Sequence, residues 1–213
     1  NNPTPFFIKL LSHYSTYPVH KKTVLQHGTI DDRNGQWTRP GNFVCNGPMN
    51  LKTWELNKQI IVEAQSSQIY LAMASWSEVL GLEGVAKFMY SHSDEERAHM
   101  LKIVKFINER GGHAIVPPLD SPPTQFGTIK EMFQDLYKHE VKVSASINDL
   151  IEVCLLEKDY ATHSFMQWYV TEQIEEEAMA KNILDKIHLI GDDKGGLYLF
   201  DNDIKLLVNQ QVN

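Results

Sequence analysis

Residues 91–100 read SHSDEERAHM, and within them Glu96 and His99 stand three residues apart. Alternating steps of three and four residues follow one face of a helix. Around this pair, such steps give Val85, Phe88, His92, Glu96, His99, Ile103 and Phe106. The carboxylate and the imidazole therefore interrupt an apolar stripe, so we expect a helix that turns both groups toward the core of the protein.

The same interruption occurs on three other predicted helices. The same alternating steps of three and four residues place a glutamate in the apolar stripe of each: Glu63 in residues 51–80, Glu140 in residues 129–158, and Glu172 and Glu176 in residues 160–190. A single Glu-x-x-His pair is commonly a solvated pair on a helix surface. That alternative does not explain why four separate apolar stripes each contain a glutamate.

The arrangement of these helices predicts an all-α fold, a four-helix bundle with one long crossover. The predicted helices cover residues 51–80, 83–110, 129–158 and 160–190, and a short last element is expected at 201–210. The link between the second and third helices contains two Pro-Pro pairs, which a helix does not tolerate. A stack of helical repeats is the all-α alternative, ranked lower because no self-similar period of about 30–45 residues is visible.

The first part of the chain has a different composition. Residues 1–49 are rich in Pro, Gly and Thr and show no sustained periodicity. Helical patterns begin after Asn50, a candidate N-cap, and Gly81 is expected to end the first helix. We therefore divide the chain into an irregular N-terminal extension, residues 1–49, and a helical bundle, residues 50–213.

Charge and cysteine content limit the partners and the compartment. The net charge is −7, which argues against a nucleic-acid partner because phosphate binding needs clustered Lys and Arg. No apolar run approaches the roughly 18–20 residues of a membrane span. Cys45 and Cys154 form neither a disulfide framework nor a metal-binding spacing, so a cytoplasmic location is expected. Because the sequence begins with Asn1, a mitochondrial or other organelle interior after transit-peptide removal is the alternative.

The inward carboxylates indicate a metal centre. Converging carboxylates in an apolar interior repel one another, so each takes up a proton or finds a cation. Arg97 and Lys102 fall outside the predicted buried stripe, and the inward positions near the other glutamates hold no Lys or Arg. Four glutamates with a neutral histidine match the charge and ligand preference of two divalent metal ions. Iron and manganese would leave the same pattern.

Four stretches resemble, in order and spacing, the helices of prokaryotic-type non-haem ferritins: ELNKQIIVEAQSSQIYLAMASW, DEERAHM, YKHEVKVSASINDL and FMQWYVTEQIEEEAMAKNILDKI. The resemblance covers about residues 49–203, including the late GGLYLFD. It implies a ferritin-like bundle with a di-iron centre. By this resemblance, iron site A comprises Glu63, Glu96 and His99, and site B comprises Glu96, Glu140 and Glu176, with Gln173 beside it.

The resemblance also assigns residues around the two-iron centre. Tyr70 matches a tyrosine that hydrogen-bonds to the centre and can supply an electron, and Trp168 matches a nearby tryptophan; core packing alone is the alternative for both. A third, inner iron site is implied at Glu95, Glu172 and Glu175, with Glu176 shared, against the alternative of an acidic solvated face. The other histidines of the bundle are interpreted as structural or exposed: His92, His113, His139, His163 and His188.

The chain differs from the bacterioferritins at two ligand positions. By the same resemblance, no haem is expected. Bacterioferritins repeat Glu-x-x-His on the fourth helix, whereas here Met179 stands three residues after Glu176. Their haem-binding methionine follows the glutamate of the second helix, and this chain has Arg97 there. A third departure is the extension of about fifty residues ahead of the first helix.

The resemblance implies an iron-storage ferritin with ferroxidase activity, in which a homo-oligomer of twenty-four copies forms a hollow shell. Its substrates are Fe(II) and dioxygen or hydrogen peroxide. The alternative is a ferritin-like subunit with a structural or docking role, in which residues 1–49 bind other protein subunits. A peroxidase related to the rubrerythrins is a third hypothesis, although the four-cysteine iron site of classical rubrerythrins is absent from the sequence.

Overall fold

The computed structural model describes residues 29–31, 36–38 and 51–211. Predictions about the rest of residues 1–50, including the docking segment and the cap at Asn50, lie outside these ranges. The helices are α2 (Leu51–Val79), α3 (Glu83–Glu109), α4 (Ile129–Leu156), α5 (Tyr160–Ile190) and α6 (Lys194–Gln211). None of them combines the length and the apolar character that crossing a membrane requires.

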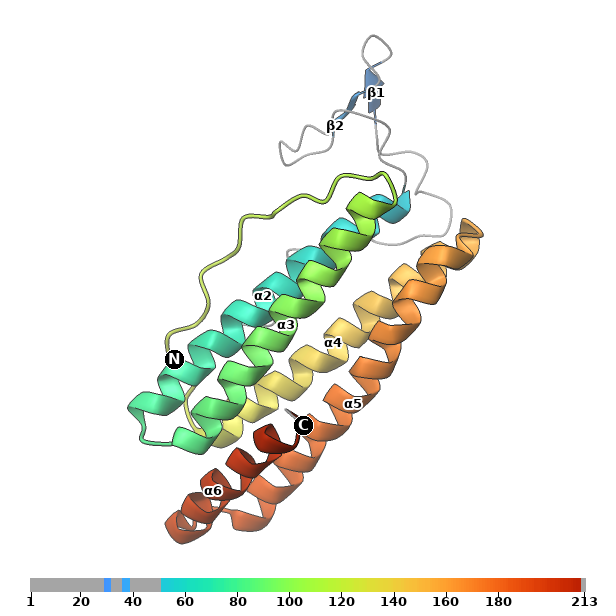
Figure 1. The fold of residues 1–213 in the computed structure, drawn as a ribbon. Helices are drawn as coiled ribbons and strands as arrows, with labels where there is room; N and C mark the ends of the chain where they lie inside the picture. Colours follow the sequence, from blue (N-terminus) through green and yellow to red (C-terminus); the bar gives the residue numbers. More distant parts are fainter. Residues whose placement is uncertain (1–28, 32–35, 39–50, 212–213) are drawn as a thin grey trace.

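The four long helices form the predicted bundle (Figure 1). Helix α2 packs on α3, α4 packs on α5, and the connection over residues 110–128 runs along the bundle to join the two pairs. The all-α fold with one long crossover is therefore confirmed. The last element is longer than predicted, because α6 begins at Lys194 and not near Asp201.

The described part of the N-terminal segment contains a short β-hairpin. Strands β1 (Thr29–Asp31) and β2 (Gln36–Thr38) pair antiparallel, with Ile30 opposite Trp37. The sequence pattern did not predict these two short strands. Thr, Ile and Trp favour strands, but runs this short carry no detectable alternation.

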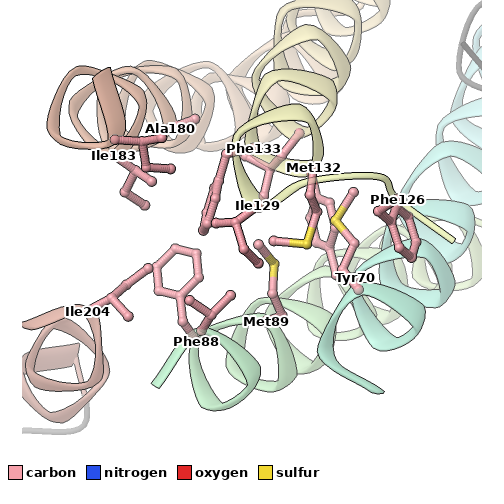
Figure 2. Packing of buried hydrophobic residues seen from close by; sticks show 14 of the residues in the cluster. Tyr70, Phe88, Met89, Phe126, Ile129, Met132, Phe133, Ala180, Ile183 and Ile204 are labelled. Carbon is pink, nitrogen blue, oxygen red and sulfur yellow. The ribbon is translucent and has the colours of Figure 1, made fainter. Parts of the chain in front are cut away.

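The interior of the bundle contains two apolar clusters with a polar layer between them. One cluster includes Met89, Phe133 and Ile183 and extends to Ile204 of α6 (Figure 2). The other lies toward the opposite end of the bundle and includes Leu56, Ile103, Ile147, Cys154 and Tyr169. On each long helix, the predicted ligand positions fall between the residues of the two clusters.

Helix α6 closes the first apolar cluster against the start of α3. A Cβ added at Gly84 would lie 1.7 Å from the carbonyl oxygen of Asp201, so only glycine permits this approach. The backbone N–H of Val85 donates to Asp201 Oδ1 at 2.9 Å, which also occupies a free donor in the first turn of α3. Phe200 and Ile204 are thereby held in the core.

The start of α4 is fixed by a capping box at the end of the crossover. Thr128 Oγ1 accepts from the N–H of Glu131 at 3.2 Å, and the Glu131 carboxylate accepts from the N–H of Thr128 at 2.8 Å. Both bonds satisfy donors that the helix itself leaves unpaired. The cap sets where α4 begins, and therefore the position of Glu140 along the bundle.

Two amide side chains of α2 hold the crossover. The N–H of Ile115 donates to Asn57 Oδ1 at 2.7 Å, and Gln65 exchanges two 3.0 Å bonds with the backbone of Asp120. A proline-rich segment forms few backbone hydrogen bonds of its own, so these side chains supply its partners. The crossover is in this way held to the first half of α2.

Candidate metal centre

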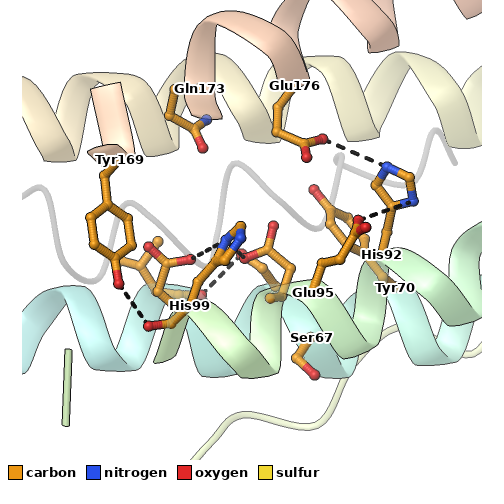
Figure 3. A network of polar contacts seen from close by, with 12 residues as sticks. Ser67, Tyr70, His92, Glu95, His99, Tyr169, Gln173 and Glu176 are labelled. Carbon is orange, nitrogen blue, oxygen red and sulfur yellow. Dashed lines mark hydrogen bonds and ion pairs between the residues drawn. The ribbon is translucent and has the colours of Figure 1, made fainter. Parts of the chain in front are cut away.

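Glu63 of α2 and Glu96 and His99 of α3 form a cluster in the polar layer, called the buried cluster below. One ligand-type atom of each lies within 4.8 Å of those of the other two. His99 Nδ1 is 3.8 Å from Glu63 Oε2 and 3.8 Å from Glu96 Oε2 (Figure 3). The three side chains are buried, and Glu96 Oε2 has no hydrogen-bond partner among the described residues. The grouping is the one expected for site A.

Neighbouring polar side chains orient Glu63. Gln59, one turn earlier on α2, donates from Nε2 to Glu63 Oε1 at 2.8 Å. Ser146 of α4 donates to Gln59 Oε1 at 2.8 Å, which fixes the direction of the amide. Because Oε1 is occupied, Oε2 is the oxygen that Glu63 presents to His99. Metal ligands are typically oriented by such outer contacts.

Glu140 of α4 lies in the same layer but outside the buried cluster. The Tyr70 hydroxyl donates to Glu140 Oε1, and Gln173 Nε2 donates to Glu140 Oε2 at 3.1 Å. Tyr70 and Glu140 are both fully buried. The predicted contact of Tyr70 with the carboxylate centre and the position of Gln173 beside Glu140 are therefore present in the structure.

Glu176 of α5 groups with His92 and Glu95 of α3 in a second set, called the His92 cluster below. His92 Nε2 is 3.7 Å from Glu176 Oε2, and His92 Nδ1 is 3.9 Å from Glu95 Oε2 (Figure 3). The structure thus groups Glu176 with His92 and Glu95, and not with Glu96 and Glu140 as the resemblance implies for site B. His92 was expected to be structural or exposed, although it stands on the predicted buried stripe.

Burial and mutual repulsion shift the protonation of these acids. Burial, together with Glu63 and Glu140, raises the pKa of Glu96 well above its usual value. Burial raises the pKa of Glu140 to about 7, and burial with Glu140 and Glu95 nearby raises the pKa of Glu176 to about 9. Burial also acts on Glu63, but contacts with His99 and Glu96 bring its pKa below the ordinary value. The metal-free layer therefore retains protons that a divalent cation would displace.

The other predicted site residues lie at the edge of the layer. Glu172 is half-buried and Glu175 is exposed, and neither belongs to the two clusters. Trp168 packs edge-on against the His99 ring, with 5.1 Å between ring centroids, and Lys102 Nζ lies 3.0 Å from the centre of its ring. His139 is buried with Nε2 2.6 Å from Ser66 Oγ, in agreement with its structural interpretation.

Sequence reasoning missed the contact of Gln59 with Glu63 and the position of His92 beside Glu176. Both carried a usable signal. Gln59 precedes Glu63 by four residues, a spacing at which side chains on a helix meet. His92 precedes Glu96 by four residues on the same apolar stripe. The partner Ser146 carried no such signal, because its contact with Gln59 depends on how α4 packs against α2.

Four long helices with buried glutamates and histidines between them define a carboxylate-rich bundle of the ferritin-like class. Comparison with known families agrees, because residues 54–190 match the ferritin model, described as a ferritin-like domain. The chain therefore belongs to the ferritin family.

Relatives in this family include the bacterial non-haem ferritin of Campylobacter jejuni, 41% identical over 150 residues, which are 70% of this chain and 90% of the relative. The bacterial non-haem ferritin of an Escherichia coli O6:H1 strain is 36% identical over 156 residues, 73% of this chain and 94% of the relative. Among solved structures, a ferritin of the archaeon Archaeoglobus fulgidus, described as a novel open pore ferritin, is 39% identical with a TM-score of 0.73. That match covers 75% of this chain and 99% of the other. The resemblance to prokaryotic-type non-haem ferritins is thereby confirmed.

Proposed function

We propose that this chain is an iron-storage subunit that oxidises Fe(II) at the polar layer of its bundle and passes Fe(III) to a mineral. The observation that carries the proposal is the buried cluster. Glu63, Glu96 and His99 come from two helices and meet inside the protein, and the contacts around them orient ligand atoms toward a common point. Membership of the ferritin family supports the same conclusion.

Two Fe(II) ions are the substrates of the proposed reaction. We assign Glu63, Glu96 and His99 to the first ion and Glu96, Glu140 and Glu176 to the second, so that Glu96 bridges them. Binding of the second ion requires Glu140 and Glu176 to turn from their present partners toward Glu96. Carboxylates are hard oxygen donors and stabilise the ferric product, while one imidazole suits the ferrous substrate.

With dioxygen as oxidant, the two ions supply the two electrons that reduce it. The balanced reaction is 2 Fe(II) + O₂ + 2 H⁺ → 2 Fe(III) + H₂O₂. With hydrogen peroxide it is 2 Fe(II) + H₂O₂ + 2 H⁺ → 2 Fe(III) + 2 H₂O. The carboxyl groups of raised pKa, Glu140 and Glu176, hold protons in the metal-free state and release them when the ions bind.

Tyr70 and Trp168 are the proposed redox neighbours of the centre. When only one Fe(II) is available, Tyr70, which contacts Glu140 of the layer, can supply the second electron and its hydroxyl proton: Fe(II) + Tyr–OH + O₂ + H⁺ → Fe(III) + Tyr–O• + H₂O₂. This leaves a neutral tyrosyl radical in a fully buried position. Trp168 contacts His99, but the Lys102 ammonium over its ring opposes loss of an electron. We therefore assign the electron to Tyr70 in preference to Trp168.

Fe(II) oxidation under air tests the proposed activity. We expect Glu96→Ala and His99→Ala to slow the initial rate by about a hundredfold or more, because each removes a ligand of the reacting ions. His188→Ala is the matched control, since His188 is exposed on the last turn of α5, away from the layer. Equal rates in all four proteins would contradict the enzymatic proposal.

Storage further requires an assembly, for which we propose a hollow homo-oligomer of twenty-four copies. Native mass measurement and electron microscopy test it. A shell that takes up iron supports storage, and a monomer or dimer that takes up none contradicts it. The docking alternative depends on residues 1–49, most of which lie outside the described ranges.

A further inference from the structure

Ser144 of α4 and Glu177 of α5 form a polar contact beside the metal centre, although neither belongs to a proposed iron position. The Ser144 hydroxyl donates to Glu177 Oε1, and both side chains are half-buried. The same hydroxyl oxygen lies 3.4 Å from Gln173 Nε2. Because its proton is directed at Glu177, Ser144 acts only as an acceptor toward Gln173.

This contact completes a set of acceptors around one amide nitrogen. Gln173 Nε2 donates to the carbonyl oxygen of Glu140 at 3.2 Å, to Glu140 Oε2 at 3.1 Å and to Ser144 Oγ at 3.4 Å. An amide has donors on one side and an acceptor on the other, so three acceptors at Nε2 fix the direction in which it faces. Gln173 is buried, and its oxygen points toward the interior of the polar layer (Figure 3).

Ser144 matters most when an ion binds at the second proposed iron position. The carboxylate of Glu140 then turns toward the ion and leaves Gln173. The carbonyl of Glu140 stays in the backbone of α4, and Ser144 stays anchored by Glu177, so the amide keeps two of its acceptors. Its oxygen remains directed at the layer. An amide oxygen is a neutral, hard ligand and adds no charge to a position that already has three carboxylates.

We propose that Ser144 and Glu177 are positioning residues for the second iron position: Glu177 directs the Ser144 hydroxyl, and Ser144 keeps Gln173 Oε1 turned toward the ion. This role rests on the proposed function. Without Glu177, the hydroxyl would donate to the carbonyl of Glu140, one turn earlier on α4, or to Gln173 Oε1. Either bond competes with those that hold the amide.

A second serine of α4 provides an internal control. Ser146 donates to Gln59 Oε1, and Gln59 Nε2 donates to Glu63 of the first proposed iron position. Ser144 and Ser146 therefore support different ions through different glutamines. Substitution of either serine by alanine should affect one ion and spare the other.

Anomalous diffraction from crystals of the assembled protein, equilibrated with a series of Co(II) concentrations without air, tests this separation. In Ser144→Ala we expect the cobalt beside Glu140 to bind about tenfold more weakly, the lower end of the loss for outer contacts of metal ligands. The cobalt beside His99 should be unchanged. In Ser146→Ala the cobalt beside His99 should be the weaker one. Equal weakening of both ions, or of neither, in Ser144→Ala would overturn the proposal.

Two substitutions test Glu177 in the same experiment. Glu177→Leu removes the acceptor of the Ser144 hydroxyl and should weaken the cobalt beside Glu140 to a similar degree. Glu177→Gln keeps an acceptor oxygen and should restore native binding, which a general loss of stability does not explain. Glu152→Leu removes an exposed carboxylate of α4 and should bind cobalt as the native protein does. Equal weakening in Glu177→Gln and Glu177→Leu would overturn the role of Glu177.

Neutron diffraction from deuterium-exchanged crystals of the metal-free native protein tests the hydroxyl direction without an ion. The Ser144 deuteron is expected on the line to Glu177 Oε1. A deuteron directed at Gln173 or at the Glu140 carbonyl would overturn the inference and leave the proposed function intact. Absence of cobalt beside Glu96 in the native crystals would instead count against the two-iron centre itself.

Discussion

The buried cluster and the His92 cluster have the same composition but are supported differently. Each combines one histidine with two glutamates, and each takes a histidine and a glutamate three residues apart on α3. In the buried cluster the carboxylate of Glu63 is held by Gln59, and His99 packs against two aromatic rings. In the His92 cluster the histidine is held by Phe88, and its carboxylates are partly exposed.

Under the proposed function, this difference implies that the two clusters respond differently to metal binding. On that proposal, the oriented ligands of the buried cluster would hold the first ion in fixed geometry, as oxidation requires. In the His92 cluster the carboxylates of Glu95 and Glu176 are less buried and are therefore freer to change partners.

Removing a carboxylate should have unequal effects in the two clusters. We expect Glu63→Ala to lower the initial rate of Fe(II) oxidation by about a hundredfold or more, because the first ion loses a ligand. Glu95→Ala should lower it by less than about tenfold. Stopped-flow absorbance under air measures both. Similar losses in the two variants would remove the distinction between the clusters.

Removing the hydrogen bond that orients Glu63, while keeping Glu63 itself, should have a smaller effect on the metal centre. Gln59→Leu deletes the donor to Glu63 Oε1, and we expect a loss of metal affinity of about 10–100-fold, as for other outer contacts of metal ligands. Ser146→Ala removes only the bond that orients Gln59, so its loss should be smaller. Competition titration with zinc measures both affinities. An unchanged affinity in Gln59→Leu would show that Glu63 needs no such support.

Tyr70→Phe tests the hydrogen bond from the Tyr70 hydroxyl to Glu140 of the polar layer. The variant leaves Glu140 Oε1 without its hydroxyl donor, so we expect the free energy of unfolding to fall by about 1–3 kcal/mol. A tyrosyl radical signal formed during Fe(II) oxidation should also disappear. Calorimetry and electron paramagnetic resonance give the two readouts. A radical that persists in the variant would assign the electron to Trp168 or another tyrosine.

The smallest effect concerns the stability of the metal-free protein as a function of pH. Glu140 and Glu176 have folded-state pKa values of about 7 and about 9. Both lie above the pKa of a glutamate in the unfolded chain, which is about 4.3. The folded state therefore binds more protons than the unfolded state between these limits, and the stability from both groups falls as pH rises from about 5 to 9.

Glu176→Gln should flatten this decline in its upper range, because glutamine has no proton to lose. Thermal unfolding of metal-free protein at several pH values measures the slope, and divalent cations should reduce the slope in the native chain by replacing the protons. Identical slopes for the native and variant proteins would show that Glu176 does not titrate as described.

Much of the bundle and part of its site could be predicted from the sequence because both follow helix periodicity. The steps of three and four residues placed Glu63, Glu96, His99 and Glu140 on buried faces, and all four are buried. The helical periodicity that located these four residues does not predict contacts between helices. The grouping of Glu176 with His92, and the bond from Ser146 to Gln59, depend on how α5 and α4 pack against the other pair.

Two elements escaped prediction for other physical reasons. The β1–β2 hairpin consists of strands too short for an alternation to be recognised. Helix α6 begins among charged residues and glycines at Lys194, where local preference for a helix is weak. Contacts of Phe200 and Ile204 with the core, and of Asp201 with Val85, supply the stabilisation that the local sequence lacks.

Anaerobic titration of the assembled protein with Co(II), followed by anomalous diffraction, tests the central claim most directly. The proposed centre predicts two cobalt ions on either side of Glu96, roughly 3.5–4 Å apart. One is expected beside Glu63 and His99, and the other beside Glu140 and Glu176. Crystals in which no cobalt lies within bonding distance of Glu96 at saturating Co(II) would contradict the assignment of the polar layer as a metal centre.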